Sequence, residues 1–512
     1  MVLDLFLMDS ERAWSRHRPP EAPTCALEDL TIGGTLPHVW SRRWSDEPNG
    51  PVLLEGDGAR SALRGDDLAQ LTGLAASRLA GYGVTPGERV LWSCGTSLDA
   101  IVGLIGALRL GAVVVPVNPS ASRSELRYVA RDVGPAISLV DRAERRDWLC
   151  EDLEDAVVLH PDALLRSTSD SAAAALDTAT PADDALIVYT SGTTGEPKGA
   201  VHTHGSLLAG SLALQTAWGW RPDDRLLLAL PLFHVHGLCA GLFGTLAAGS
   251  SAVIFERFVP AQVLDAVGES TMFFGVPTMY HRLAESGRAA ELSALRLCVS
   301  GSAPLPADLW RRFHADWGVS VLERYGMSET LLTLSNPLDG ERRPGSVGFP
   351  LPGVEAAIAD ADEAGVGELM VRGPSLCRGY RNRTAASEAM WHDGWFGTGD
   401  LASVGDDDYV SIRGRRTELI ITGGHNVYPA EVEAVLGRHP SVGEIAIIGL
   451  PSAEWGESVT AFVVGRDGEP DIDALAHLAA QELTSYKRPR EFRVVDSLPR
   501  NAMGKVQRRD LL

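Results

Sequence analysis

A polar, glycine-rich loop lies between residues 189 and 200, where the sequence reads YTSGTTGEPKGA directly after the apolar run ALIV. Glycine lets a backbone approach a ligand closely, and amides and hydroxyls donate hydrogen bonds to phosphate oxygens. Lys198 adds a positive charge. The spacing of Gly192 and Gly195, and the Gly199 that follows Lys198, exclude the P-loop pattern G-x-x-x-x-G-K-[ST]. The loop alone therefore indicates either a phosphate-binding loop of another kind or a mobile glycine-rich turn.

Further stretches of the chain match one protein family in that family's order. They are LPLFHVHG, SGSAPLP, ERYGMSET, GSVGFPLPGVE, GELMVRGP, GWFGTGD, IRGRRTELIITGGHNVYPAEVE and PRNAMGK. With the loop, they resemble the signatures of the adenylate-forming superfamily, which contains acyl-CoA synthetases, nonribosomal-peptide adenylation domains and firefly-type luciferases. The resemblance extends from Arg60 to the C-terminus. It implies an enzyme that uses ATP and Mg²⁺ to activate a carboxylic acid, with coenzyme A as the acceptor in the acyl-CoA synthetases.

The resemblance also implies an ATP site built from several of these stretches. The residues expected around the β- and γ-phosphates are Thr190, Ser191, Gly192, Thr193, Thr194, Gly195 and Lys198. Those expected around the nucleoside and α-phosphate are Gly301, Ser302 and Ala303 at the adenine, Tyr325 stacked on the base, Ser328 at the α-phosphate, and Asp400 and Arg415 at the ribose. Glu329 is expected to hold Mg²⁺, a hard cation suited to carboxylate and phosphate oxygens. Taken singly, Tyr325 also fits a core aromatic residue, Glu329 a surface charge and Asp400 a turn or a helix cap.

Attack of a carboxylate on the α-phosphate brings two anions together, so a cation must reach both groups in the transition state. Lys505, in NAMGK, matches the family's lysine for that role, and the alternative is one more exposed C-terminal cation. With Lys505, the resemblance implies Thr193 and His234 as catalytic residues, His234 matching the residue that gates the acyl pocket.

In the family, the small C-terminal domain rotates after the first half-reaction and brings a glycine loop to the path of the thiol. The matching loop here is TGGHN, so the resemblance implies that Gly423, Gly424 and His425 contact coenzyme A. Thr417 stands where the family usually has Asp or Lys at the hinge. This departure leaves the balance between the two half-reactions open.

The identity of the acid is less sharply indicated. Family members that activate amino acids use an aspartate in the stretch matched here by LFHVHG, which makes an α-amino acid unlikely. The stretches GVPTMYHRLAE, PLFHVHGL and ERYGMSETLLTLS look most like the malonyl-CoA synthetases, which implies that Arg282 pairs with the distal carboxylate of malonate and that Leu332 limits the size of its substituent. An arginine extending from a helix end is the alternative for Arg282. A ligase for a bulkier monocarboxylic acid and a non-catalytic binding homologue are the alternative functions.

The elements that must position these residues follow from apolar periodicity. ERVLWSC, LDAIVGLIGALRLGA and VVVPVNP predict a strand, a buried helix and a parallel strand, and TMFFGVP, TMYHRLAES and LRLCVSGSA repeat that order. The fold class is therefore α/β, with a large N-terminal domain (residues 1–413) of largely parallel, helix-covered sheets and a small α+β C-terminal domain (residues 414–512), which the resemblance implies is mobile. Residues 167–185 are predicted to be a surface connector. The first fifty residues are assigned no chemistry.

Composition limits the partners. The chain has 512 residues, 45% of them hydrophobic, and a net charge of −21, so a nucleic acid or an anionic membrane surface is not expected as a partner. Six cysteines without a C-x-x-C pair favour a reduced, cytoplasmic protein without a zinc site. The uncharged run from Leu226 to Phe255 is predicted to be buried helix and strand rather than a membrane span. The sequence favours neither a monomer nor a homodimer.

Overall fold

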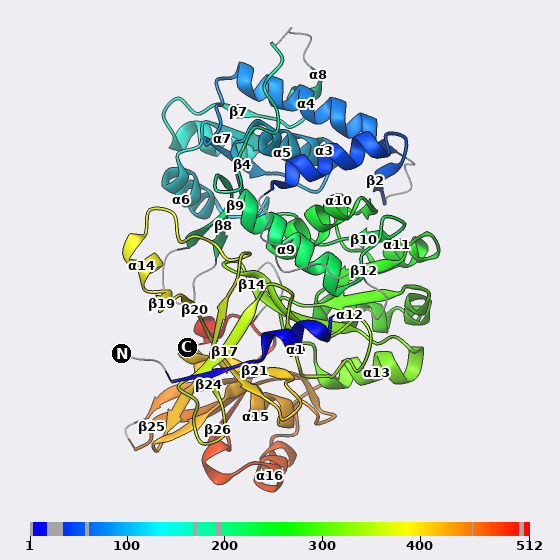
Figure 1. Cartoon of the computed structure of the whole chain (residues 1–512). Helices are drawn as coiled ribbons and strands as arrows, with labels where there is room; N and C mark the ends of the chain where they lie inside the picture. Colours follow the sequence, from blue (N-terminus) through cyan, green and yellow to red (C-terminus); the bar gives the residue numbers. More distant parts are fainter. Residues whose placement is uncertain are drawn as a thin grey trace.

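Three sheets and their helices form a large N-terminal domain, and a fourth sheet forms a small C-terminal domain (Figure 1). The computed structural model describes residues 4–17, 34–56, 61–166, 172–190, 197–452, 454–500 and 506–511. Among these residues, no helix combines the length and the apolar character that crossing a membrane requires.

The first sheet is parallel except at one edge and is covered by helices on both faces. Its strand order is β7 (Val158–Leu159), β6 (Ile137–Val140), β4 (Arg89–Ser93), β5 (Val113–Pro116), β8 (Asp184–Thr190) and β9 (Lys198–Thr203), with only the β8–β9 pair antiparallel. Val90 and Trp92 face one apolar cluster and Leu91 faces another, because successive side chains of a strand point to opposite faces. The helices around this sheet are α4 (Gly65–Gly81), α5 (Leu98–Leu110), α6 (Arg123–Val133), α7 (Ala143–Asp152) and α8 (Ala163–Arg166).

The second sheet carries the carboxyl-terminal strand ends that border the candidate site. Its order is β16 (Phe349–Pro350), β15 (Leu331–Ser335), β14 (Leu322–Met327), β13 (Leu297–Ser300), β12 (Met272–Gly275), β10 (Arg225–Leu228), β11 (Ser251–Ile254), β2 (Pro51–Glu55) and β3 (Ala62–Arg64), parallel from β14 to β2. Its helices are α3 (Leu36–Asp46), α9 (His204–Ala217), the π-helix η1 (His236–Phe243), α10 (Gly244–Ala248), α11 (Pro260–Asp265), α12 (Pro277–Glu285) and α13 (Ala307–Trp317). One apolar cluster runs from this sheet through α3, α4, α5, α9 and α10 to the first sheet. The prediction that residues 226–255 are buried helix and strand is confirmed.

The third sheet differs from the largely parallel architecture that the sequence predicted. It contains β1 (Leu5–Leu7), β17 (Glu355–Ala359), β18 (Gly367–Arg372), β20 (Trp395–Val404) and β19 (Trp391–His392) in that order, with β21 (Val410–Arg415) paired to β20, and all its pairs are antiparallel. The only helix within this stretch, α14 (Thr384–Glu388), has five residues. Turns and irregular segments therefore join these strands in place of the helical crossovers that parallel pairing requires. The α/β class itself is confirmed by the first two sheets.

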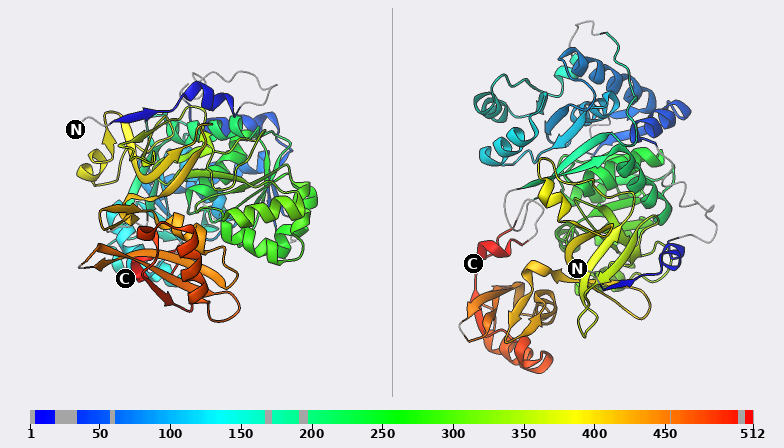
Figure 2. Two further views of the ribbon diagram at one scale, coloured as in Figure 1. Left: turned by 90° about the horizontal axis from the view of Figure 1, so that it is seen from below. Right: turned by 60° about the vertical axis from the view of Figure 1, so that its left-hand side comes forward.

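The N-terminal segment, to which the sequence assigned no role, connects the third sheet to the second. Strand β1 lies at the edge of the third sheet, and helix α1 (Ser10–Ser15) packs against β16 (Figure 2). Trp14 donates a hydrogen bond from Nε1 to the carbonyl of Val354 at 2.9 Å. The buried His17 places Nε2 3.3 Å from the carbonyl oxygen of Phe349.

The burial of His17 predicts an acid-sensitive attachment of this segment. Burial lowers the pKa of His17 from 6.5 to about 4, so between these values the unfolded chain binds a proton that the folded chain excludes. The contribution of His17 to the free energy of unfolding is then fully present above pH 6.5. It falls as the pH drops toward 4, by at most about 3 kcal/mol for one such histidine. We expect the melting temperature of His17→Gln to fall less between pH 7 and pH 5 than that of the wild type. The exposed His38→Gln should behave as the wild type, and equal slopes in both variants would contradict this.

The C-terminal domain packs a mixed, mostly antiparallel sheet against two helices and forms a separate lobe (Figures 1 and 2). Its strand order is β23 (His425–Val427), β22 (Ile420–Thr422), β25 (Gly456–Gly465) and β24 (Val442–Ser452), with β26 (Glu491–Val494) parallel to β25, and its helices are α15 (Pro429–Leu436) and α16 (Ile472–Glu482). The hydroxyl of Tyr428 donates to Oδ2 of Asp362 in the large domain at 2.8 Å. The predicted boundary between residues 413 and 414 falls inside β21, six residues before β22, and stays a prediction.

Candidate active site

Strand β14 brings three of the polar side chains of the site into place. Successive residues of a strand face opposite ways, so Glu323 and Tyr325 share one face and Arg324 takes the other. Oε1 of Glu323 accepts a hydrogen bond from the amide of Leu305 at 2.9 Å. Tyr325 donates its hydroxyl proton to Oδ2 of Asp400 at 2.6 Å. The strand therefore holds the loop after β13 with one side chain and reaches the third sheet with another.

Asp400 lies where the second and third sheets meet. It is 6% exposed, and its Oδ1 lies 3.0 Å from Nε of Arg415, its partner in the β20–β21 ladder. The structure thus brings together Tyr325, Asp400 and Arg415, three of the residues that the sequence placed around the nucleoside. A carboxylate bordered by a phenol and a guanidinium offers acceptor oxygens at a fixed orientation, which is what recognition of ribose hydroxyls needs.

The loop Gly301–Ala303 follows β13 and touches the second histidine of the FHVH stretch. Ser302 has a φ of 70°, a left-handed conformation that few residues other than glycine adopt. Its Oγ lies 3.2 Å from Nδ1 of His236. A Cβ atom on Gly301 would overlap the guanidinium of Arg324, so glycine is required for this close approach. The predicted adenine loop, the histidine stretch and β14 therefore converge.

Arg324 is a buried charge at this point of convergence. It is 4% exposed, and neither Nε nor Nη2 finds a hydrogen-bond partner among the residues that the structure describes. Burial lowers its pKa to about 9, which still leaves the guanidinium charged at neutral pH. An unpaired buried charge costs several kcal/mol. Its presence indicates a site for an anion.

The two neighbouring histidines are neutral at neutral pH. Burial lowers the pKa of His234 to about 4, and burial, reinforced by the charge of Arg324, holds the pKa of His236 well below its usual value. Nε2 of each ring is buried and has no partner among the described residues. These two atoms and the guanidinium supply directed polar groups in an apolar surrounding, as small-molecule sites do.

Glu329, Lys198 and Tyr380 form a second cluster. Glu329 is 5% exposed, and its Oε1 accepts a hydrogen bond from the hydroxyl of Tyr380 at 2.7 Å. Nζ of Lys198 lies 5.2 Å from the centre of the Tyr380 ring. Burial raises the pKa of Glu329. Leu331, two residues further on, has a φ of 58°, a strained conformation for a bulky residue that is often associated with functional sites.

This cluster fits Mg²⁺ bound together with phosphates. No group of three or more His, Cys, Asp or Glu side chains within the described ranges is arranged to hold a metal by itself. Mg²⁺ is commonly bound by one or two carboxylates and completes its shell with substrate phosphates and water. The buried oxygens of Glu329 are suitable donors for such a site.

Several predicted residues lie outside the described part of the chain. These are Ser191, Gly192, Thr193, Thr194 and Gly195 of the opening loop, and Lys505. The residues that frame the loop are described: Thr190 ends β8, and Lys198 begins β9 as its ladder partner. The half-buried Ser328 has its carbonyl oxygen 2.7 Å from Nε2 of the buried His202, and Leu332 is buried on β15 beside Gly326.

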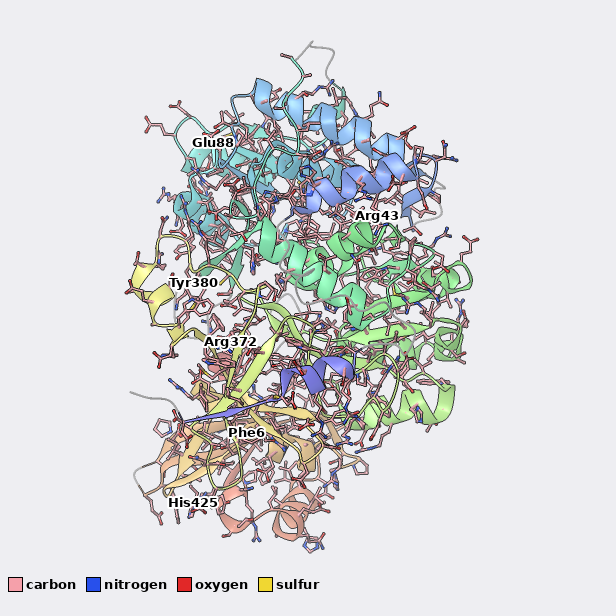
Figure 3. The ribbon with its side chains drawn as sticks, viewed as in Figure 1. Phe6, Arg43, Glu88, Arg372, Tyr380 and His425 are labelled. Carbon is pink, nitrogen blue, oxygen red and sulfur yellow. The ribbon has the colours of Figure 1, made fainter. Side chains whose placement is uncertain are left out.

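Two further predictions are not brought to these clusters. Arg282 is exposed at the end of α12, with its guanidinium carbon 5.0 Å from the centre of the Phe258 ring, and its pairing with a carboxylate stays a prediction. Gly423 and Gly424, with φ of 57° and 81°, form the exposed turn between β22 and β23. His425 stacks on Tyr486 with ring centres 4.4 Å apart. Figure 3 shows His425 in the C-terminal domain, far below Tyr380.

Four residues of the site were missed by sequence reasoning: Arg324, His236, Tyr380 and His202. Arg324 could have been noticed in the sequence, because it directly follows the mostly apolar stretch VSVLE. The other three are recognised only by their contacts, because their partners lie far away in the sequence.

The chain is similar in sequence and in structure to AMP-binding enzymes and CoA ligases. A family model described as AMP-binding enzyme matches residues 42–381, and one described as AMP-binding enzyme C-terminal domain matches residues 431–505. A malonate–CoA ligase of Arabidopsis thaliana is 35% identical, with 93% of this chain and 89% of that protein covered. A sulfoacetate–CoA ligase of Cupriavidus necator is 36% identical, with 95% and 99% covered. The crystal structure of ATP-bound MatB from Rhodopseudomonas palustris has 37% identity and a TM-score of 0.88, with 93% of this chain and 98% of that chain covered.

Proposed function

We propose that this chain, which belongs to the AMP-binding enzyme family, is an AMP-forming ligase. It joins malonate or a small substituted malonate to coenzyme A at the expense of ATP. The observation that carries the choice of acid is Arg324, a buried guanidinium with two unpartnered nitrogens. A second carboxylate on the substrate would form charge-assisted hydrogen bonds with it. Two relatives are named for malonate and for sulfoacetate, acids that each carry a second anionic group.

In the first half-reaction, a carboxylate oxygen of the acid bonds to the α-phosphorus of ATP, and pyrophosphate leaves. Lys198 offsets the charge of the phosphates, and Asp400 and Arg415 orient the ribose. Glu329 would hold Mg²⁺, which supplies positive charge beside the phosphate oxygens when bound. Lys505 is proposed to reach both the attacking carboxylate and the α-phosphate, where a fixed cation acts most strongly in the transition state.

In the second half-reaction, the sulfur of coenzyme A bonds to the acyl carbon, and AMP leaves. A lysine still lying over the acyl-adenylate would obstruct the thiol, so the C-terminal domain is proposed to rotate about the segment that contains Thr417. That residue is exposed in a short 3₁₀ turn between β21 and β22. Rotation would move Lys505 away from the acyl-adenylate and bring the turn Gly423–Gly424 toward it.

The neutral histidines and Arg324 have different roles in binding the acid. A guanidinium can bind a distal carboxylate through two nitrogens, while neutral imidazoles beside it add no charge that would bind the reacting carboxylate too strongly. An apolar acid of the same length would leave the guanidinium unpaired, which disfavours it. A bulkier monocarboxylic acid is therefore the weaker alternative. A cytoplasmic location remains part of the proposal and is supported by the five described cysteines, which form no disulfide.

The proposed function is tested by supplying a panel of acids to the purified chain with ATP, Mg²⁺ and coenzyme A. Malonate, methylmalonate, sulfoacetate, butyrate and a long-chain fatty acid form a series in which the distal group and the size vary separately. Pyrophosphate, AMP and the thioester are followed individually. Malonyl-CoA formation well above butyryl-CoA formation is expected. A preference for butyrate or the fatty acid would overturn the choice of acid, and no acid-dependent pyrophosphate release would overturn the ligase.

The glycine turn of the C-terminal domain separates the two half-reactions. We expect Gly424→Leu to leave acid-dependent pyrophosphate release largely intact and to block thioester formation, because the side chain would fill space that only glycine leaves open. Gly394→Leu is the matched control: both glycines are exposed hairpin-turn residues with φ of 81° and 84°, and a Cβ on either would meet no described atom within 4 Å. It carries the same left-handed strain but should form thioester normally. Equal loss of both half-reactions in Gly424→Leu would contradict the role of the turn.

A further inference from the structure

The segment between β18 and α14 is added to the edge of the first sheet. The amide of Val201 on β9 donates to the carbonyl of Gly379 at 2.9 Å, and the amide of Arg378 donates to the carbonyl of Val201 at 3.0 Å. The amide of Arg381 donates to the carbonyl of Gly199 at 2.8 Å. A strand that starts at the end of the phosphate loop is therefore held in place by a segment that belongs, by sequence, to the third sheet.

Tyr380, labelled in Figure 3, is the residue of this segment whose side chain contacts groups of the other sheets. Its hydroxyl donates to Oε1 of Glu329, and its ring lies beside Nζ of Lys198. One side chain thus touches both a carboxylate from the second sheet and a lysine from the first. A hydrogen bond to one oxygen fixes the plane of a carboxylate, and a ring beside an ammonium group restricts where that group can lie.

We propose that Tyr380 is a positioning residue for Mg²⁺-ATP, which orients Glu329 through its hydroxyl and Lys198 through its ring. The inference rests on the proposed function, since it takes Glu329 as the Mg²⁺ ligand and Lys198 as a phosphate contact. It assigns the two halves of one side chain to two different tasks. Loss of the hydroxyl affects the metal, and loss of the ring affects the nucleotide as well.

The chain offers a matched control in Tyr428. Its hydroxyl donates to Oδ2 of Asp362 at 2.8 Å, so it makes the same phenol–carboxylate contact as Tyr380, but between the C-terminal domain and the loop that joins β17 to β18. Both tyrosines are half-buried. Tyr428→Phe therefore removes an equivalent hydrogen bond without touching Glu329 or Lys198.

The experiment measures ATP binding by calorimetry at increasing Mg²⁺ concentration, without an acid, so that no turnover occurs. We expect Tyr380→Phe to raise the Mg²⁺ concentration that gives half of the increase in ATP affinity by about tenfold to a hundredfold, as loss of a group that orients a metal ligand commonly does. Its ATP affinity without Mg²⁺ should equal that of the wild type. Tyr380→Leu should in addition weaken Mg²⁺-free binding by about two- to fivefold. Tyr428→Phe should match the wild type in both respects.

A second background keeps the test decisive. In Glu329→Gln the metal ligand is already impaired, so adding Tyr380→Phe should shift the Mg²⁺ titration no further. A wild-type titration in Tyr380→Phe, an equal shift in Tyr428→Phe, or a full further shift in the double variant would each overturn the inference while ATP still binds. A wild-type chain that binds no ATP under any condition would overturn the proposed function, and this inference with it.

Discussion

Replacing Lys505 with alanine should lower the rate of acyl-adenylate formation by about a hundredfold to a thousandfold, the usual effect of removing one preorganised contact to the charge that develops in a transition state. Thioester formation from a supplied malonyl-adenylate should remain close to the wild-type rate, because no second anion then has to approach the α-phosphate. Pyrophosphate release in the first assay and malonyl-CoA in the second measure the two half-reactions separately.

Arg509 provides the comparison for this variant. It lies four residues further along the same tail, and its side chain is 60% exposed. Arg509→Ala removes a cation of the tail without removing the proposed catalytic one, and both rates should stay near those of the wild type. Equal losses in both half-reactions of Lys505→Ala would exclude the assignment of this lysine to adenylation alone, and with it the rotation that the assignment requires.

The second large effect concerns the acid. Arg324→Met keeps an unbranched apolar stem and removes the charge, and we expect kcat/KM for malonate to fall by about ten- to a hundred-and-fiftyfold, which corresponds to about 1.5–3 kcal/mol for a hydrogen bond to a charged group. Use of butyrate should be unchanged or improved, since no guanidinium is left unpaired. Steady-state kinetics with both acids give the ratio directly.

Arg282→Ala tests the arginine that the family resemblance implied. Its exposure beside Phe258 predicts a small effect on malonate, whereas the resemblance predicts a loss as large as the one expected for Arg324→Met. If Arg282→Ala abolishes the preference for malonate and Arg324→Met does not, the distal carboxylate binds at Arg282, and Arg324 has a structural role. If neither variant changes the ratio, the malonate assignment fails and the ligase assignment remains.

Much of the fold follows from local patterning. The alternation of apolar strands with buried helices predicted both parallel sheets, because such runs need cover on two faces. The same reasoning missed the antiparallel third sheet, whose strands are joined by turns and irregular segments and not by buried helices. It also gave no role to the N-terminal strand β1, whose three residues are too few to show a period and pair with β17, some 350 positions away.

Only some residues of the site were predicted from the sequence, and there is a physical reason why the others were missed. Residues in glycine-rich or charged signatures, such as Asp400 and Glu329, were named because their surroundings in the sequence are distinctive. Arg324 and Tyr380 were missed because what distinguishes them is burial and a partner on another sheet. The predicted surface connector of residues 167–185 shows the same limit: Asp177 within it forms an ion pair at 2.9 Å with the buried Arg109.

The alternation of side chains along β14 has a consequence for how the enzyme measures its substrate. Arg324 and Tyr325 are joined by a single peptide bond, so, with the proposed roles, the backbone positions that hold the distal carboxylate and the nucleoside stay one residue apart, with a rise of about 3.3 Å per residue. Small shifts of the surrounding domains cannot lengthen this spacing. Acceptance of a longer dicarboxylic acid should therefore require a shorter cationic side chain at position 324, because sliding the strand by one residue would move Tyr325 away from Asp400.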